Sequence, residues 1–245
     1  MELRAASTAR FLRGMPPKRI VLSGPSGFLG QRVLACLLKV HTDRLNHGLK
    51  PGEVVLLSSS PGRLMERLSL KYGASVMRTI RASRVDYYTQ HDEVMWTDQL
   101  LSLGLEGEDC VFVNLAAVAG PVLGINDAMM HVNYRAPVAA ARACESLKFG
   151  HWIQSSTQAT SAERAGQVLT PIVVTHSLIL KLYFLLQSSI FFFKVTSRKN
   201  SFLIKVPYSR GKAMADSALA RMDDLPVTIA SLGLLYCKTD GNNML

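Results

Sequence analysis

The sequence predicts an α/β protein built on a doubly wound, parallel β-sheet. An apolar run at 20–22 ends in a glycine-rich turn, and a helix-like pattern of apolar residues follows through 33–38. Further short apolar runs follow helix-like segments at 53–57, 110–117 and 149–153, as expected when crossover helices join parallel strands. The 245 residues, 48% of them hydrophobic, are enough for one large domain with a buried core.

Three glycines follow the first strand at the spacing G-x-x-G-x-x-G. Gly24 permits the tight turn out of the strand, Gly27 lets the backbone approach a pyrophosphate, and Gly30 lets the helix pack against the strand. The free N–H groups at the start of this helix favour an anion. The segment therefore predicts a dinucleotide-binding unit. The loop residues expected to bind the cofactor are Gly24, Ser26, Gly27, Phe28, Leu29 and Gly30.

The end of the second strand indicates which dinucleotide is bound. The first helix is expected to run to His41 or Asn46, and the strand at 53–57 ends in a serine-rich segment with no acid. An acid at this point would bind the ribose hydroxyls of NAD, whereas a small polar residue with a nearby arginine accommodates the 2′-phosphate of NADP. Ser58 and Arg63 therefore favour NADP, with NAD as the alternative. A helix at 64–72 and a third strand within 74–88 are expected next.

Later strand ends carry the remaining candidate residues. The fourth strand, at 110–117, ends in Asn-Leu-Ala-Ala, whose small residues leave room for a dinucleotide. The fifth strand, at 149–153, is followed by the hydroxyl-rich Gln-Ser-Ser-Thr segment at 154–157. Tyr208 and Lys212 are four residues apart, so they share one face of a helix. The ammonium would then lower the pKa of the tyrosine, because a cation favours the tyrosinate.

Taken in this order, the motifs resemble the extended short-chain dehydrogenase/reductase family, the NAD(P)-dependent epimerase/dehydratase group. The resemblance covers 18–167 and 206–237. It implies a Rossmann-type fold and hydride transfer at a carbonyl or alcohol carbon of a small molecule such as a sugar nucleotide. It also implies the catalytic residues Tyr208 (general acid/base), Lys212 (pKa modifier and ribose anchor), Thr157 and Ser156 (substrate hydroxyl partners, Thr157 preferred) and Asn133 (holding a water). The cofactor-binding residues implied beyond the glycine loop are Ser58, Arg63, Asn114, Ala116, Ala117 and Lys212.

The net charge of +10 does not indicate a nucleic-acid partner, because it is concentrated in two segments. Residues 1–19 hold five Lys/Arg against one acid, and 168–205 hold five and no acid, which leaves 18 basic and 17 acidic residues elsewhere. The basic segment at 1–19 is either a tail or a presequence. We expect a cytoplasmic protein, or a mitochondrial or plastid matrix protein if the presequence is real. The four cysteines have no C-x-x-C spacing, so neither a metal site nor a disulfide is expected.

The apolar segment at 168–205 interrupts the resemblance. Without it, the separation between Thr157 and Tyr208 would fall from 51 positions to 13, which suits a strand, a loop and a helix that meet at one site. Three interpretations remain open: a membrane helix within 172–193, a substrate lid, or a retained intron, which the A/T-rich type of composition favours. A membrane partner is expected only under the first of these.

The C-terminal part also departs from the family pattern. A sixth strand is expected within 225–236, but Cys237 and Lys238 stand where the family has Gly-Pro, and the strand has no arginine. The chain stops at Leu245, so the smaller substrate domain of extended members is expected to be missing. The alternative function is a non-catalytic, dinucleotide-binding structural or assembly subunit, with or without a membrane association. We also allow for a homodimer.

Overall fold

The computed structural model describes residues 17–118, 127–157 and 207–232, which form a six-stranded, fully parallel sheet in the order β3-β2-β1-β4-β5-β6. The strands are β1 (Arg19–Ser23), β2 (Glu53–Ser58), β3 (Ile80–Arg84), β4 (Cys110–Asn114), β5 (His151–Thr157) and β6 (Val227–Leu232). The helices are α2 (Phe28–Asn46), α3 (Pro61–Ser69), α4 (Ala74–Met77), α5 (Glu93–Ser102), α6 (Asp127–Met130), a π-helical turn η1 (His131–Arg135), α7 (Ala136–Ser146) and α10 (Pro207–Leu219). The predicted doubly wound parallel sheet is confirmed.

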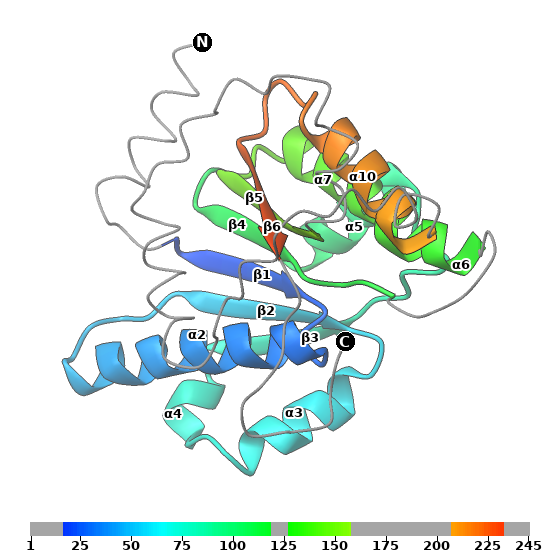
Figure 1. The fold of residues 1–245 in the computed structure, drawn as a ribbon. Helices are drawn as coiled ribbons and strands as arrows, with labels where there is room; N and C mark the ends of the chain where they lie inside the picture. Colours follow the sequence, from blue (N-terminus) through cyan, green and yellow to red (C-terminus); the bar gives the residue numbers. More distant parts are fainter. Residues whose placement is uncertain (1–16, 119–126, 158–206, 233–245) are drawn as a thin grey trace.

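Helices cover both faces of the sheet, as Figure 1 shows. One hydrophobic cluster joins α2, α3 and α4 to one face, and a second joins α5, α7 and α10 to the other. Alternate residues of β2 enter different clusters: Val54 and Leu56 the first, Val55 and Leu57 the second. Side chains alternate between the two faces of a strand, so a strand buried on both sides must be apolar throughout. This explains why the strands appear in the sequence as continuous apolar runs.

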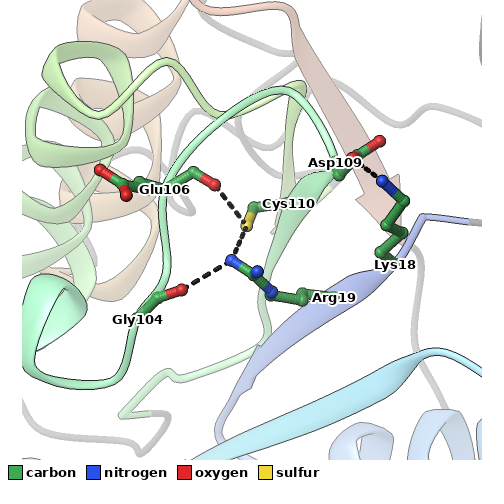
Figure 2. Close-up of polar contacts among 6 residues, drawn as sticks. All are labelled: Lys18, Arg19, Gly104, Glu106, Asp109 and Cys110. Carbon is green, nitrogen blue, oxygen red and sulfur yellow. Dashed lines mark hydrogen bonds and ion pairs between the residues drawn. The ribbon is translucent and has the colours of Figure 1, made fainter.

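A set of polar contacts fixes the start of β1 at the edge of the sheet where the strands begin (Figure 2). Lys18 forms an exposed ion pair with Asp109 at 2.5 Å. Arg19 Nη1 donates to the carbonyl oxygen of Gly104 at 2.6 Å and lies 3.9 Å from Cys110 Sγ. Burial raises the pKa of the Cys110 thiol, which disfavours the reactive thiolate. These contacts therefore tie β1 to β4 and serve the structure.

The predicted boundaries differ from the observed ones mainly at β4 and β5. The fourth strand ends at Asn114 and not at 117. The fifth begins at His151 and not at 149, and it continues to Thr157 because Ser155, Ser156 and Thr157 pair with β6. The predicted hydroxyl-rich segment is therefore the last part of the strand itself. Helix α2 ends at Asn46, the later of the two predicted ends.

Several predictions fall outside the described residues. They are the segment at 168–205, the tail at 1–16 and the family-like strand end at 234–236. Within the described part of the chain, no helix combines the length and apolar character needed to cross a bilayer. Whether 168–205 is a retained intron, a lid or a membrane helix stays a prediction.

Candidate active site

In the glycine loop between β1 and α2, two of the three glycine positions have room for glycine only. Gly24 has φ +69°, and a Cβ there would lie 2.7 Å from the backbone nitrogen of Ala116. A Cβ on Gly30 would lie 1.9 Å from the carbonyl oxygen of Gly24. At Gly27 the corresponding contact is an ordinary 3.4 Å. The chain's own packing therefore requires Gly24 and Gly30, whereas a bound group would supply the reason for Gly27.

Helix α2 begins directly at this loop. Its N-cap is Gly27, which gives no side-chain cap to the first turn, so backbone N–H groups are left for an anion. Gln31 donates from Nε2 to the carbonyl oxygen of Ser26 at 2.7 Å. The Arg32 guanidinium lies 3.5 Å from the ring centre of Phe28, which fixes that ring at the helix start. The loop thus fits the pyrophosphate of a dinucleotide.

A buried hydrogen-bond network between polar side chains of β1, β4 and β5 supports the glycine loop. The Ser23 hydroxyl donates to Asn114 Oδ1, and Asn114 Nδ2 donates to Gln154 Oε1 at 2.9 Å. The same hydroxyl oxygen accepts from the backbone N–H groups of Leu115 and Ala116 at 3.2 and 3.4 Å. These contacts turn the chain out of β4 beside Gly24. Asn114 is 1% exposed, so its described contacts support the loop, and direct cofactor contacts by it or by Ala117 stay predictions.

A groove lies beside the loop, at the end of β2. It has a volume of about 540 Å³. Sequence reasoning named Ser26, Ser58 and Arg63 but missed Glu66 and Arg67, although their spacing of three and four residues from Arg63 places all three on one helix face. The lining residues are Ser26, Ser58, Ser59, Ser60, Arg63, Glu66 and Arg67. The groove therefore carries two guanidinium groups against one carboxylate.

Lys212 lies in the interior, against the end of β5. It is 1% exposed, and its Nζ donates to the carbonyl oxygen of Ser155 at 3.0 Å. Burial lowers its pKa from 10.5 to about 8, and the Asp216 carboxylate opposes this effect. The ammonium is thus held at the edge of the sheet where the strands end, the edge that also carries the glycine loop.

The predicted lowering of the Tyr208 pKa by Lys212 is wrong for this structure. The pKa of Tyr208 is raised, first because the phenol is buried and then because the Asp216 carboxylate disfavours a second negative charge. The prediction treated the tyrosine and the lysine as an isolated pair. It omitted burial and a buried acid two turns further along α10.

That acid, Asp216, is the main residue that sequence reasoning missed. It is fully buried, and its Oδ2 accepts a hydrogen bond from Ser156 Oγ at 2.5 Å. The spacing Tyr208, Lys212, Asp216 repeats every four residues, which was the available signal. Ser156 therefore directs its hydroxyl to α10. Thr157 is the last residue of β5, half-buried, and α10 packs against this strand; its substrate contact stays a prediction.

Asn133 lies in the π-helical turn η1 and is fully buried. Its Oδ1 accepts from the N–H of Val118, and its Nδ2 donates to the carbonyl oxygen of the same residue, both at 2.9 Å. A Cβ on Gly211 would lie 3.1 Å from the Asn133 Cβ, so this helix-interior glycine allows α10 to approach η1 closely. The described contacts of Asn133 fix the chain after β4, and the water-holding role stays a prediction.

Lys212 is expected to make the folded state more stable as the pH rises from 8 to 10.5. In this window the unfolded chain holds the lysine proton and the folded chain does not, so the free energy of unfolding increases. The shift corresponds to about 3 kcal/mol for this group. Urea unfolding of the wild type and of Lys212→Met should show a difference that grows across the window. The same comparison with Lys71→Met, on an exposed side chain, is the control. A flat difference for Lys212→Met would contradict the expectation.

No protein-family model and no curated protein matches the sequence. Solved structures do match the fold. A thiolation-reductase di-domain from an archaeal non-ribosomal peptide synthetase has a TM-score of 0.55 at 16% identity, covering 99% of this chain and 62% of that chain. ElxO with NADP bound has a TM-score of 0.55 at 13% identity, covering 91% and 76%. UDP-glucuronic acid 4-epimerase from Bacillus cereus in complex with NAD has a TM-score of 0.51 at 14% identity, covering 88% and 57%.

This chain thus spans less than two thirds of the length of most of these structures. At 13–16% sequence identity, these similarities show the fold alone. The structures include an epimerase in complex with NAD, a reductase-containing di-domain and a protein with NADP bound. The chain therefore has a Rossmann-type, doubly wound α/β fold, which it shares with these structures.

Proposed function

We propose that the chain is the dinucleotide-binding part of an NAD(P)-dependent oxidoreductase or epimerase/dehydratase. The observation that carries the proposal is the glycine loop that opens α2, where the N-cap Gly27 leaves the first N–H groups without a side-chain cap and its own Cβ would meet only an ordinary contact. A nicotinamide dinucleotide supplies reversible hydride transfer. The chain's own residues would bind its pyrophosphate at the start of α2 and present the hydroxyl of Tyr208 from α10 to a substrate oxygen.

The roles of the α10 residues follow from their placement. Lys212 would anchor the nicotinamide ribose, since its ammonium is held at the end of β5. Tyr208 would donate or accept the substrate proton, with Thr157 as the hydrogen-bond partner of the same oxygen. The proposed substrate is a small carbonyl compound or a sugar nucleotide, because one structural neighbour is a UDP-glucuronic acid 4-epimerase. A homodimer remains part of the proposal.

The experiment that tests this function is a titration of the full chain with NADPH and NADH. Binding should be saturable and should quench the fluorescence of the buried Trp152, and UDP-glucuronic acid should be tested as the first substrate probe. Failure to bind either dinucleotide would overturn the proposal. Binding without turnover of any probe would favour the second candidate.

That second candidate is a dinucleotide-binding subunit without turnover. The observation in its favour is the raised pKa of Tyr208, which makes the tyrosinate harder to form than in an isolated tyrosine. Under this alternative the loop would bind the cofactor for stability or assembly alone.

We propose NADP as the cofactor, and Arg63→Ala and Arg67→Ala are each expected to weaken NADPH binding about tenfold with little effect on NADH. A guanidinium pairs strongly with a phosphate, and about 1.4 kcal/mol corresponds to a tenfold change in affinity. Isothermal titration of both cofactors measures the selectivity. Arg78→Ala, on an exposed side chain outside the groove, is the matched control. Tighter NADH binding by the wild type would contradict the assignment, and Glu66 would then be the residue to test as a ribose ligand.

A further inference from the structure

We propose that Asp216 is a positioning residue for the Tyr208–Lys212 pair: through Ser156 it fixes α10 against the end of β5 and so sets where the ammonium and the phenol lie. The catalytic meaning of this role rests on the function proposed above. The contacts themselves do not depend on it.

Two successive turns of α10 hold two successive residues of β5. Lys212 Nζ donates to the backbone oxygen of Ser155 at 3.0 Å. One turn later, Asp216 Oδ2 accepts from the side-chain hydroxyl of Ser156 at 2.5 Å. Asp216 and Lys212 are 0% and 1% exposed. A buried hydrogen bond to a charged group is short and strong, so the helix can neither slide nor rotate against the strand without breaking both contacts.

This arrangement also shows how one hydroxyl group at the end of β5, that of Ser156, is used. Ser156 directs its hydroxyl to α10, where it donates its proton to Asp216. Its single proton is therefore committed to the carboxylate, so Ser156 is a poor donor to a substrate oxygen.

Asp216 is also the charged group that acts on both members of the pair. It raises the pKa of Lys212 against the effect of burial, and it raises the pKa of Tyr208. Other charged or titratable groups lie on the elements packed against α10, namely α6, η1, α7 and β5. They are Asp127, His131, Tyr134, Arg135, Arg142, Cys144, Glu145 and His151. None of them contributes to the shift of Lys212. Burial and Asp216 therefore determine together whether Lys212 carries a proton near pH 8.

The test is the substitution Asp216→Asn, which keeps the shape of the side chain, removes its charge and replaces the charged acceptor of the Ser156 hydrogen bond with a weaker, neutral amide. The Lys212 side chain is titrated in the full chain, without cofactor, by the ¹³C resonance of its Cε. We expect the proton affinity of Lys212 to fall about tenfold in the variant. The matched control is Asp98→Asn, on the exposed face of α5, which should leave the titration unchanged. An unchanged Lys212 titration in Asp216→Asn would overturn the proposal.

NADPH binding at several pH values separates this inference from the proposed function. We expect binding to weaken as Lys212 loses its proton, and to do so at lower pH in Asp216→Asn. A wild-type chain that binds no NADPH overturns the proposed function, while the ¹³C titration still decides the role of Asp216. Equal NADPH binding by both proteins across the pH range overturns the positioning role alone. If Asp216→Asn does not fold, Asp216→Glu replaces it: a changed Lys212 titration supports the proposal, and an unchanged one overturns it.

Discussion

Gly30→Ala is expected to destabilise the folded chain by about 3 kcal/mol or more and to abolish dinucleotide binding. The new Cβ would lie 1.9 Å from the carbonyl oxygen of Gly24, and 2.9 Å from the Cα of Pro25. Both neighbours are backbone, so they cannot rotate away as a flexible side chain could. The start of α2 would have to move away from β1, and the N–H groups at that start would no longer converge on one anion.

Urea unfolding followed by the fluorescence of the buried Trp96 and Trp152 measures the loss of stability, and NADPH titration measures the loss of binding. Gly62→Ala is the control, because that glycine lies in α3 and its Cβ would meet nothing within 4 Å. Alanine is the better helix former, so the control should be neutral or slightly stabilising. A Gly30→Ala chain as stable as the control would show that the loop is not packed as described.

The fold could be predicted from sequence because its main signals are local. Continuous apolar strands alternate with amphipathic helices, and this pattern specifies a parallel sheet with both faces covered. The predicted strand ends are wrong where contacts with a segment distant in the sequence determine where the strand ends. The end of β5 is polar and gave no strand signal, yet pairing with β6 extends the strand to Thr157. In β4, the Ser23 hydroxyl binds the N–H groups of Leu115 and Ala116, so the ladder ends at Asn114.

The site could be predicted only in part for a related reason. Gly24 and Gly30 are required because other backbone atoms lie very close to both positions, and this requirement is visible in the sequence as the two glycines themselves. The environment of Tyr208 is not visible there, because it depends on how deeply α10 is buried and on the carboxylate of Asp216. A spacing of four residues suggests that groups share a helix face. The direction of a pKa shift depends on whether that helix face is exposed to solvent or buried. Exposure is set by the packing of the helix in the folded chain.

Tyr208→Phe is expected to lower hydride transfer by about 10²- to 10⁴-fold, while leaving NADPH binding close to that of the wild type. The phenol oxygen is the only group that the substitution removes, so the loss would report proton transfer and not cofactor affinity. Consumption of NADPH with a simple aldehyde, or reduction of NADP⁺ with UDP-glucuronic acid, measures turnover, and titration measures the affinity. Tyr88→Phe, on a side chain that is 53% exposed, is the control and should retain full activity.

The pH profile gives this test a second, independent readout. An ordinary tyrosine is already protonated at neutral pH, and the raised pKa of Tyr208 extends this protonation to higher pH. A protonated phenol suits donation of a proton to a carbonyl oxygen better than removal of a proton from an alcohol. Reduction should therefore be favoured over oxidation at neutral pH. Oxidation should gain as the pH rises, and this gain should disappear in Tyr208→Phe. A Tyr208→Phe chain with undiminished turnover would remove the tyrosine from the chemistry. A wild-type chain that binds NADPH and turns over neither probe would instead favour the non-catalytic subunit, in which the same buried tyrosine contributes packing alone.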